Sequence, residues 1–403
     1  MTLHGRTLVT AMCLAQVCNL LPHVVVPAIM AQHLMPLWHL SAAQAGLMAS
    51  AYAFGYMLAV PMLTALTDRF DARGILIVGS TVSGLGTIAF GLFADDLLSA
   101  SVFWAIAGAG FGGAYMPGLK ALTDRLPTGD VSRSVTLYTS SFSIGVGLSF
   151  LVSQIIAETY GWRAAFTVTG IAPLAMVIVS FMLAPFKPKP LPGHPLDFRP
   201  VFRNRAALGY ILGYGAHCFE LYGMRTWIVA FWTFVAAGQS DHVLLGPVAV
   251  SVLVTLLSLP ASVLGNEASI RFGRHRAITI IMLASAAVGL SIGFCAGLSP
   301  LILLPLILVY GFTVPGDSGS LTAGMSQSAM PENRGATMAL HSTIGFATSA
   351  LGAWGTGVAL DVAGGPMSAS AWLAAFSLLA VGILMGPLAL LWSRRTTKPV
   401  SIA

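Results

Sequence analysis

Long apolar stretches, separated by short polar connections, recur along the whole chain. We expect twelve membrane-spanning helices, near residues 8–31, 44–66, 75–94, 98–121, 134–157, 163–185, 207–235, 243–267, 277–297, 300–325, 336–360 and 370–393. Each stretch reaches the roughly 20 residues that a helix needs to cross a bilayer. The pattern therefore predicts an all-α integral membrane protein with little room for a soluble domain.

One polar connection is longer than the others. Residues 186–205, FKPKPLPGHPLDFRPVFRNR, are rich in proline and basic residues and lie close to the midpoint of the 403-residue chain. This composition is typical of a linker. We therefore divide the chain into an N-terminal six-helix bundle (1–185), a cytoplasmic central linker (186–206) and a C-terminal six-helix bundle (207–403).

Short motifs repeat in the same order in the two halves. Arg69 and Arg271 each follow an even-numbered span and lie 202 residues apart. The Gly-Phe pair of AGFGGAYMPG (109–118) recurs in YGFTVPGDSG (310–319) at a shift of 201 residues. Such matches at a nearly constant offset indicate a duplicated six-helix unit, and hence two pseudo-symmetric bundles.

Composition and charge place the chain in the membrane. Only 8% of the residues are charged, compared with about 25% in soluble domains. Of the 20 Lys and Arg residues, 18 fall on one side of the alternating topology, and only Arg163 and Arg225 lie elsewhere. The positive-inside rule then puts both termini in the cytoplasm. We expect a bacterial inner (plasma) membrane location, and no nucleic-acid partner despite the net charge of +6.

Motifs of catalysis are not found in the sequence. The four cysteines lie inside apolar runs without metal-ligand spacing, so they predict neither a metal site nor a disulfide framework. A Walker sequence, a zinc spacing and a nucleophile elbow are also absent from the sequence. We therefore expect no catalytic residue, no cofactor and no enzyme activity.

The loop TALTDRFDARG, residues 64–74, carries both charge signs at the end of the second predicted span. It resembles the cytoplasmic signature G-x-L-A-D-R-x-G-R-R between helices 2 and 3 of the major facilitator superfamily. Asp68, Arg69 and Arg73 match this signature, whereas Thr64 and Asp71 replace its two glycines. The resemblance extends over essentially the whole chain through helix count, linker and duplicated halves. It implies two six-helix bundles that rock about a central site.

In that family, the matching residues look like a charge relay that latches neighbouring helices in one state of the transport cycle. The resemblance therefore implies a conformational latch in this loop. The second copy keeps Arg271 and Arg274 but has Ile270 where the acid belongs, with Glu267 one turn earlier. A basic loop that only sets the topology is the alternative interpretation.

The seventh predicted span carries ionisable residues where lipid tolerates few. Glu220 lies 12 residues past Leu208, about 18 Å along a helix, near the middle of a hydrocarbon core about 30 Å thick. His217 lies three residues earlier on a neighbouring part of the same face. A carboxyl group there could cycle between protonated and charged forms, as a proton-coupling site requires. The alternative is a neutral Glu220 that holds helices together by hydrogen bonds.

Two more charged residues lie within predicted spans. Arg225 either faces an anionic substrate or snorkels to the outer interface beside Trp227. Asp317 lies in VPGDSGS, where Pro315 and two glycines weaken the helix, and such breaks are tolerated in membranes mainly where they line a cavity. Asp317 is therefore a proton-coupling or substrate candidate, and a fixed partner for an arginine or Lys120 is the alternative.

Neutral polar residues complete the set of candidates. Gln16, Asn19 and His23 are spaced by three and four residues and form one polar stripe on the first predicted span. The stripe either faces a water-filled central cavity or makes hydrogen bonds between helices. His341 in the eleventh predicted span is a further cavity candidate, with a role in packing as the alternative.

These features together predict a secondary active transporter that moves a small organic solute by proton-coupled alternating access, as a symporter or an antiporter. Sodium is the alternative coupling ion, because carboxylates bind it too. We expect the protein to function in the lipid bilayer as a monomer. The alternatives are a broad-specificity multidrug efflux antiporter and a membrane receptor of the same fold that transports nothing.

Overall fold

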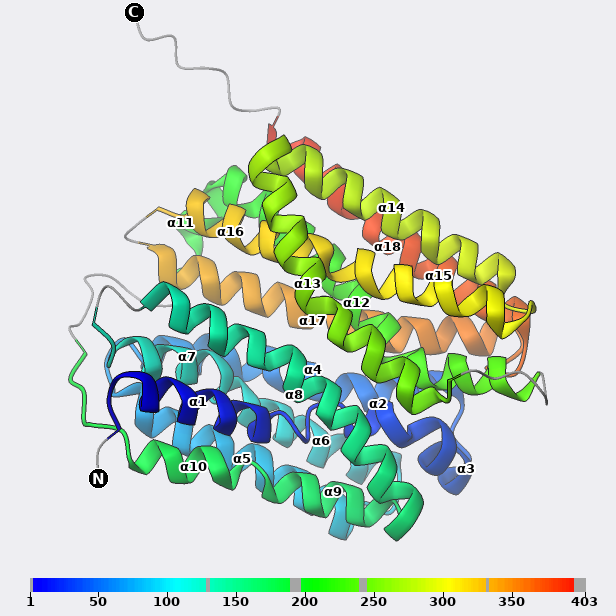
Figure 1. The fold of residues 1–403 in the computed structure, drawn as a ribbon, viewed down its shortest axis with the longest axis horizontal. Coiled ribbons are helices and arrows are strands. Elements are labelled where there is room, and N and C mark those ends of the chain that lie inside the picture. Colours follow the sequence, from blue (N-terminus) through cyan, green and yellow to red (C-terminus); the bar gives the residue numbers. More distant parts are fainter. Residues whose placement is uncertain (1–2, 128–130, 189–196, 239–244, 331–332, 395–403) are drawn as a thin grey trace, which may run out of the picture.

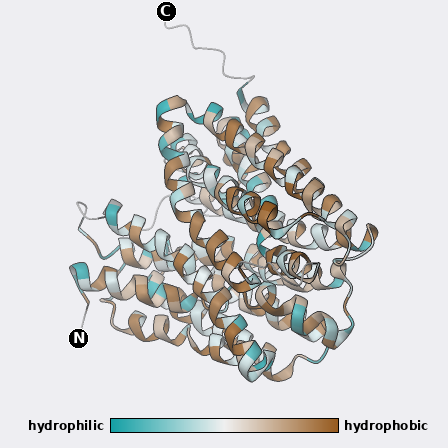
Figure 2. Ribbon diagram, turned by 45° about the vertical axis from the view of Figure 1, so that its right-hand side comes forward, coloured by the Kyte–Doolittle hydropathy of each residue, from teal (hydrophilic) through white to brown (hydrophobic). Residues whose placement is uncertain are grey.

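The computed structural model describes residues 3–127, 131–188, 197–238, 245–330 and 333–394, and within these ranges the regular structure is entirely helical. Nine helices of the described chain are long and apolar enough to cross a membrane. Figure 2 shows hydrophobic residues, in brown, along the length of the helices. The prediction of an all-α integral membrane protein is confirmed, whereas the count of twelve spans stays a prediction.

The nine spans match nine of the predicted ones. They are α4 (Ala42–Leu66), α5 (Ala72–Phe93), α6 with α7 (Leu97–Gly112 and Tyr115–Thr123), α8 (Val131–Tyr160), α9 with α10 (Trp162–Ile171 and Leu174–Phe181), α13 (Pro247–Phe272), α14 (Arg274–Cys295), α15, η2 and α16 (Pro300–Thr313, Val314–Asp317 and Ser318–Ser328), and α18 (Ala369–Arg394).

Three predicted spans correspond to helices that are not among the nine. The seventh and eleventh are α12 (Arg205–Ala237) and α17 (Arg334–Val362), which are 33 and 29 residues long. Both helices are therefore long enough to cross a membrane, so length does not explain why they are not among the nine. The first consists of α1 (Gly5–Asn19), α2 (Val25–Ile29), η1 (Met30–Leu34) and α3 (Met35–Trp38). Most of the predicted cavity and coupling residues lie in these three segments.

The expectation of one continuous first helix over 8–31 is wrong, because α1 ends at Asn19 and α2 begins only at Val25. Pro22 lies in the intervening turn, and its ring removes a backbone donor. His23 is consequently not on the same helix as Gln16, and the polar stripe is interrupted.

Side chains of α8 satisfy the backbone that this break frees. The hydroxyl group of Ser149 accepts a hydrogen bond from the Val24 amide at 3.2 Å and donates one to the Leu21 carbonyl at 2.6 Å. The Gln154 amide donates to the Ala28 carbonyl at 3.0 Å. A broken helix at membrane depth needs such partners, since lipid offers none.

In the view of Figure 1, α1–α10 occupy the lower part of the molecule and α12–α18 the upper part. The short helix α11 (Arg199–Arg203) lies in the predicted linker, of which residues 189–196 fall outside the described chain. The division at 186–206 is not tested by these features and stays a prediction.

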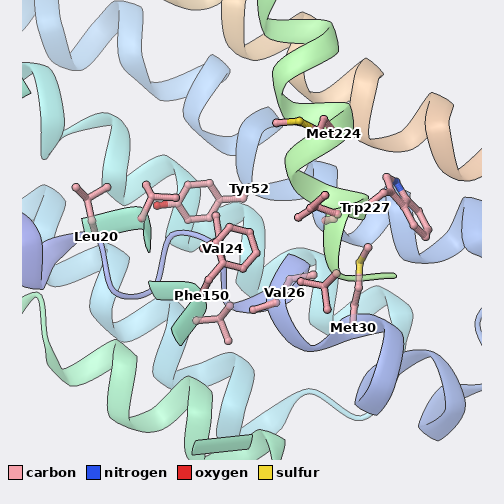
Figure 3. Close-up of a cluster of buried hydrophobic side chains, with 14 of the residues drawn as sticks. Leu20, Val24, Val26, Met30, Tyr52, Phe150, Met224 and Trp227 are labelled. Carbon is pink, nitrogen blue, oxygen red and sulfur yellow. The ribbon is translucent and has the colours of Figure 1, made fainter. Parts of the chain in front are cut away.

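Helices α4 and α17 pack against each other and join the two parts. Near the middle, the rings of Tyr56 and Phe346 stack with centroids 3.7 Å apart. At the end where α4 begins, the backbone amides of Ala42 and Ala43 donate to the carboxylate of Asp361 at 2.8 and 2.7 Å. Figure 3 shows an apolar cluster in which Tyr52 of α4, Val24, Phe150 of α8 and Trp227 of α12 take part.

Candidate functional site

A small pocket lies where residues of both halves of the chain meet. Its polar lining includes His23 in the turn after α1, Ser50 and Tyr52 on α4, Tyr222, Arg225 and Thr226 on α12, and Ser349 on α17. Its volume is about 30 Å³, counted as room for the centres of water-sized molecules. That is enough for a few ordered waters but not for an organic solute. A solute can therefore enter only if the lining helices separate.

Arg225 contributes a buried cation to this pocket. Its side chain is 7% exposed, and its guanidinium carbon lies 5.4 Å from the centre of the Tyr222 ring. Within the described part of the chain, Arg225 forms no ion pair with an acidic residue. The structure thus places Arg225 at the pocket and not at the outer interface where snorkelling would put it.

His23 lies on the other side of the pocket from α12, in an aromatic surrounding. Its ring centroid is 5.2 Å from that of Tyr52, 5.1 Å from Phe111 and 6.4 Å from Tyr222. Among the residues that the structure describes, neither ring nitrogen of His23 has a hydrogen-bond partner. Among the described residues, the ring nitrogens of His23 have no hydrogen-bond partner and Arg225 has no acidic partner, so a polar ligand can use both side chains.

Glu220 lies on α12 but faces other helices of the C-terminal half. Its Oε1 accepts hydrogen bonds from the Ser285 hydroxyl of α14 at 2.9 Å and from the Tyr310 hydroxyl of α15 at 3.0 Å. Its side chain is fully buried, and Oε2 has no partner among the described residues. Both donors are neutral, so no described residue that hydrogen-bonds to Glu220 carries a charge that would balance a negative one.

His217 and Asp317 form an ionisable pair near Glu220, since His217 lies one helical turn before Glu220 on α12. His217 Nδ1 and Asp317 Oδ1 approach to 2.6 Å, and both side chains are buried. The pair is ionic only when His217 carries a proton. Asp317 ends the 3₁₀ segment η2, which confirms the predicted weakening of the helix at Pro315. The partner of Asp317 is therefore a histidine, and Lys120 pairs instead with Asp124 at 3.2 Å.

The other cavity candidates lie outside this pocket. His341 stacks on Tyr214 with ring centroids 3.8 Å apart, and its Nε2 is 3.5 Å from the Thr322 hydroxyl, so it belongs with the His217 group. Gln16 accepts a hydrogen bond from Tyr138 at 2.8 Å. Asn19 is buried, and both its polar atoms are unpaired within the described chain. Of the five cavity candidates, His23 and Arg225 line the pocket.

Sequence reasoning missed several residues of the site. Tyr222 precedes Arg225 by three residues, a helical spacing that would have pointed to it. The sequence carries no comparable signal for Ser50 and Tyr52, which line the pocket, or for Ser285 and Tyr310, which donate to Glu220. These contacts depend on how separate helices face each other.

The loop after α4 forms a charged cluster, although its members differ from the expected ones. The Arg125 guanidinium donates to both oxygens of Asp71 at 2.8 Å, and the amides of Arg73 and Phe186 donate to the same carboxylate at 3.0 and 2.9 Å. Partial burial acts to raise the pKa of Asp71, but these hydrogen bonds outweigh it and the pKa lies below its usual value. Asp71, which replaces a glycine of the signature, is thus the acid at the centre of this cluster.

The five expected latch residues do not converge in one cluster. Asp68 lies beside the first turn of α17, where a Cβ on Gly335 would be 3.7 Å from its Oδ2. Burial raises the pKa of Asp68, and the nearby Lys120 opposes this effect. Arg73 donates to the Leu183 carbonyl at 2.7 Å. In the second copy, Arg271 pairs with Glu267 at 2.9 Å, and the Arg274 Nη1 atom has no partner in the described ranges.

Comparison with known proteins gives one family and many relatives. The model of the Major Facilitator Superfamily matches residues 12–353. A gallate transporter of Pseudomonas putida is 30% identical over 165 residues, 40% of this chain and 36% of its own length. Human monocarboxylate transporter 11 is 30% identical over 182 residues, 44% of this chain and 36% of its own length. The aligned part of this chain thus spans about a third of each of these two relatives.

Two solved structures share the fold at low sequence identity. The POT family transporter PepTSo has a TM-score of 0.77 at 13% identity and covers 98% of both chains. A bacterial homologue of the human lysosomal transporter Spinster, in an inward-facing and unoccupied conformation, has a TM-score of 0.72 at 15% identity. It covers 96% of this chain and 94% of its own. At such identities the likeness concerns the fold alone.

Proposed function

This chain belongs to the major facilitator superfamily, and on that premise we propose that it is a secondary transporter that moves a small organic anion by proton-coupled alternating access. The central pocket receives the anion, and the lining helices of the two halves separate alternately towards the two sides of the membrane.

The observation that carries this proposal is the buried Arg225 without an acidic partner in the described chain. A guanidinium group removed from water is costly unless an anion balances it. Arg225 can offer a carboxylate two parallel hydrogen bonds, and the unpaired nitrogens of His23 can serve a second acceptor on the same solute. The names of the gallate and monocarboxylate transporters, both relatives of this chain, agree with an anionic substrate class.

Proton coupling is supported by the position of the ionisable groups relative to the pocket. Arg225, Glu220 and His217 all lie on α12, so a movement of this helix connects the anion site with the acids. Protonation of Glu220 removes a charge whose hydrogen-bond partners, among the residues described, are two neutral hydroxyl groups. An anion bound at Arg225 balances the positive charge of the guanidinium group, and a proton bound at Glu220 removes the negative charge of the carboxylate. When both are bound, the moving helices carry less unbalanced charge than when only one is bound.

The test uses the purified protein reconstituted in phospholipid vesicles with an imposed pH gradient. Radiolabelled benzoate, gallate and lactate represent aromatic and aliphatic monocarboxylates, and benzamide is the neutral counterpart of benzoate. We expect gradient-driven accumulation of at least one carboxylate, abolished by a protonophore, and no accumulation of benzamide. A sodium gradient at constant pH examines the alternative coupling ion in the same vesicles.

The matched variants are Arg225→Met and Arg163→Met. Both remove one of the two cations that lie apart from the basic side of the predicted topology. Arg163, however, is half exposed and pairs with Asp95 at 2.9 Å, and neither residue lines the pocket. We expect Arg225→Met to weaken apparent affinity for the carboxylate about 100-fold, since hydrogen bonds to charged groups contribute about 1.5–3 kcal/mol. Equal transport by the two variants, or transport of neutral and cationic drugs instead of carboxylates, would overturn the proposal and favour multidrug efflux.

A further inference from the structure

A second cavity, unrelated to the central pocket, opens on the side of the N-terminal half. It lies between α4, α5 and α6 and has a volume of about 500 Å³. All its lining residues are apolar or glycine, among them Ala59, Met62 and Leu66 of α4, and Gly74 and Val78 of α5. We call this cavity the lateral groove.

The lateral groove opens towards the hydrocarbon region of the membrane. Met62 and Val78 are 60% and 61% exposed, and the three helices that form the groove are among the membrane spans. Small residues shape its floor, because Gly79 of α5 packs directly against the backbone of Gly113 and leaves no side chain there. In a bilayer, the molecules that surround such an opening are lipids.

The length of the groove corresponds to one leaflet. It begins beside Leu66, the last residue of α4, and Gly74 in the first turn of α5, and its lining continues to Val82. The eight residue steps from Gly74 to Val82 rise about 12 Å along the helix. Half of a hydrocarbon core about 30 Å thick is roughly 15 Å. The groove therefore covers the depth of acyl chains in the leaflet on the side of the α4–α5 loop.

An unpaired cation lies at the loop end of the lateral groove. Arg69 is in the turn between Leu66 and Ala72 and is exposed, and its guanidinium group forms no hydrogen bond or ion pair with another described residue. Of the acids in the same loop, Asp71 is neutralised by Arg125, and Asp68 lies beside α17. A guanidinium group binds phosphate well, so Arg69 is suited to a lipid headgroup.

We propose that the lateral groove binds an anionic phospholipid, with one acyl chain between α4, α5 and α6 and the headgroup phosphate at Arg69. This site is separate from the central pocket and does not depend on the proposed substrate. It gives the α4 helix, which also packs against α17, a lipid ligand on another part of its surface.

Native mass spectrometry of the full chain, with phosphatidylglycerol and phosphatidylcholine of the same acyl chains, tests the proposal. We expect one retained phosphatidylglycerol per protein, preferred over phosphatidylcholine about fivefold, because one basic residue at a membrane surface contributes about 1 kcal/mol. Arg69→Gln should bring this ratio close to one. Arg203→Gln, which removes an exposed cation from α11, is the control and should leave the ratio unchanged.

A second pair of variants fills the groove without touching the charge. A Cβ on Gly74 would meet no atom within 4 Å, so Gly74→Leu is accommodated and its side chain occupies the loop end of the groove. Gly297→Leu adds the same bulk at an exposed turn elsewhere. We expect loss of the retained lipid in Gly74→Leu only. Equal retention of both lipids by the wild type, an unaffected adduct in Gly74→Leu, or a dimer that forms through this face without lipid would each overturn the proposal.

Discussion

Asp71 and Glu220 are both acids held by several hydrogen bonds, yet their donors differ in kind. Asp71, in the loop between α4 and α5, accepts from the Arg125 guanidinium and from two backbone amides. Glu220, inside the C-terminal half, accepts from the hydroxyl groups of Ser285 and Tyr310, and its Oε2 has no partner in the described chain. The first acid is partly exposed and has a full cationic partner, whereas the second is fully buried and has no cationic partner among the described residues.

This difference separates a structural acid from one that can exchange a proton. A carboxylate that a guanidinium group and two amides stabilise keeps its charge over the physiological pH range. A buried carboxyl group with neutral donors and one free oxygen can be stable in either form, depending on what the surrounding helices present. Buried acids of the second kind are therefore the better candidates for coupling, even where an acid of the first kind lies in a recognisable motif.

The largest effect is expected for Glu220→Gln. The variant keeps the shape and the hydrogen-bonding capacity of the side chain but cannot release a proton. We expect pH-driven accumulation to fall about 100-fold, which corresponds to about 2.7 kcal/mol of lost coupling. Exchange of external for internal substrate at equal pH should persist. Asp71→Asn is the matched control, and a comparable loss of accumulation in that variant would contradict the distinction.

The His217–Asp317 pair sharpens the comparison, because it carries its own cation when protonated. Asp317→Asn removes the charge on one side, and we expect about a tenfold loss of pH-driven transport, in the range of ordinary coupling energies. His341→Gln changes a neighbouring histidine that contacts Tyr214 and Thr322 and forms no ion pair with an acid in the described ranges. Initial rates of both variants, measured from pH 5 to 8, should differ in their pH dependence, and identical profiles would remove Asp317 from the coupling group.

Asp361 is intermediate between Asp71 and Glu220, because its donors in the described chain are neither a guanidinium group nor hydroxyl groups but two backbone amides. These amides belong to Ala42 and Ala43 in the other half of the chain. Asp361→Ala should destabilise the contact between the start of α4 and the end of α17 by about 1 kcal/mol, the usual contribution of a helix cap. Hydrogen exchange of the amides at Ala42 and Ala43 should then be about fivefold faster. Asp96→Ala removes a cap that acts within its own segment, on the Ser99 amide at 2.8 Å, and should leave those two amides unchanged.

The smallest effect is expected on the thermal stability of Asp71→Asn. Because the folded-state pKa of Asp71 is lowered, its stabilising contribution is present above the unfolded-state pKa and is lost as the pH falls through the folded-state value. After allowance for solvent screening, we expect a loss of about 1 kcal/mol at pH 7. Unfolding in detergent should show this difference at pH 7 and a smaller one near pH 4. A difference that grows on acidification would contradict the assignment.

Sequence alone determined the features that depend on local composition. The apolar stretches predicted the positions of the spans, Pro315 and its glycines predicted the break at η2, and the loop at 64–74 pointed to the family that the comparison confirms. It also identified Glu220 and Arg225 as residues that lipid would not tolerate without a reason. Each of these signals is contained in about one helix length of sequence, so no knowledge of neighbouring helices was needed.

Only the tertiary structure decided which groups these residues meet. Hydropathy gives no sign that Asp317 faces His217, that Tyr310 donates to Glu220, or that Arg125 takes Asp71 as its partner. It also predicted one polar stripe where α1 ends before His23. Each such contact depends on the rotation of a helix about its own axis and on its neighbours. Packing between helices far apart in the sequence determines this rotation and these neighbours. The sequence of a single helix does not specify either of them.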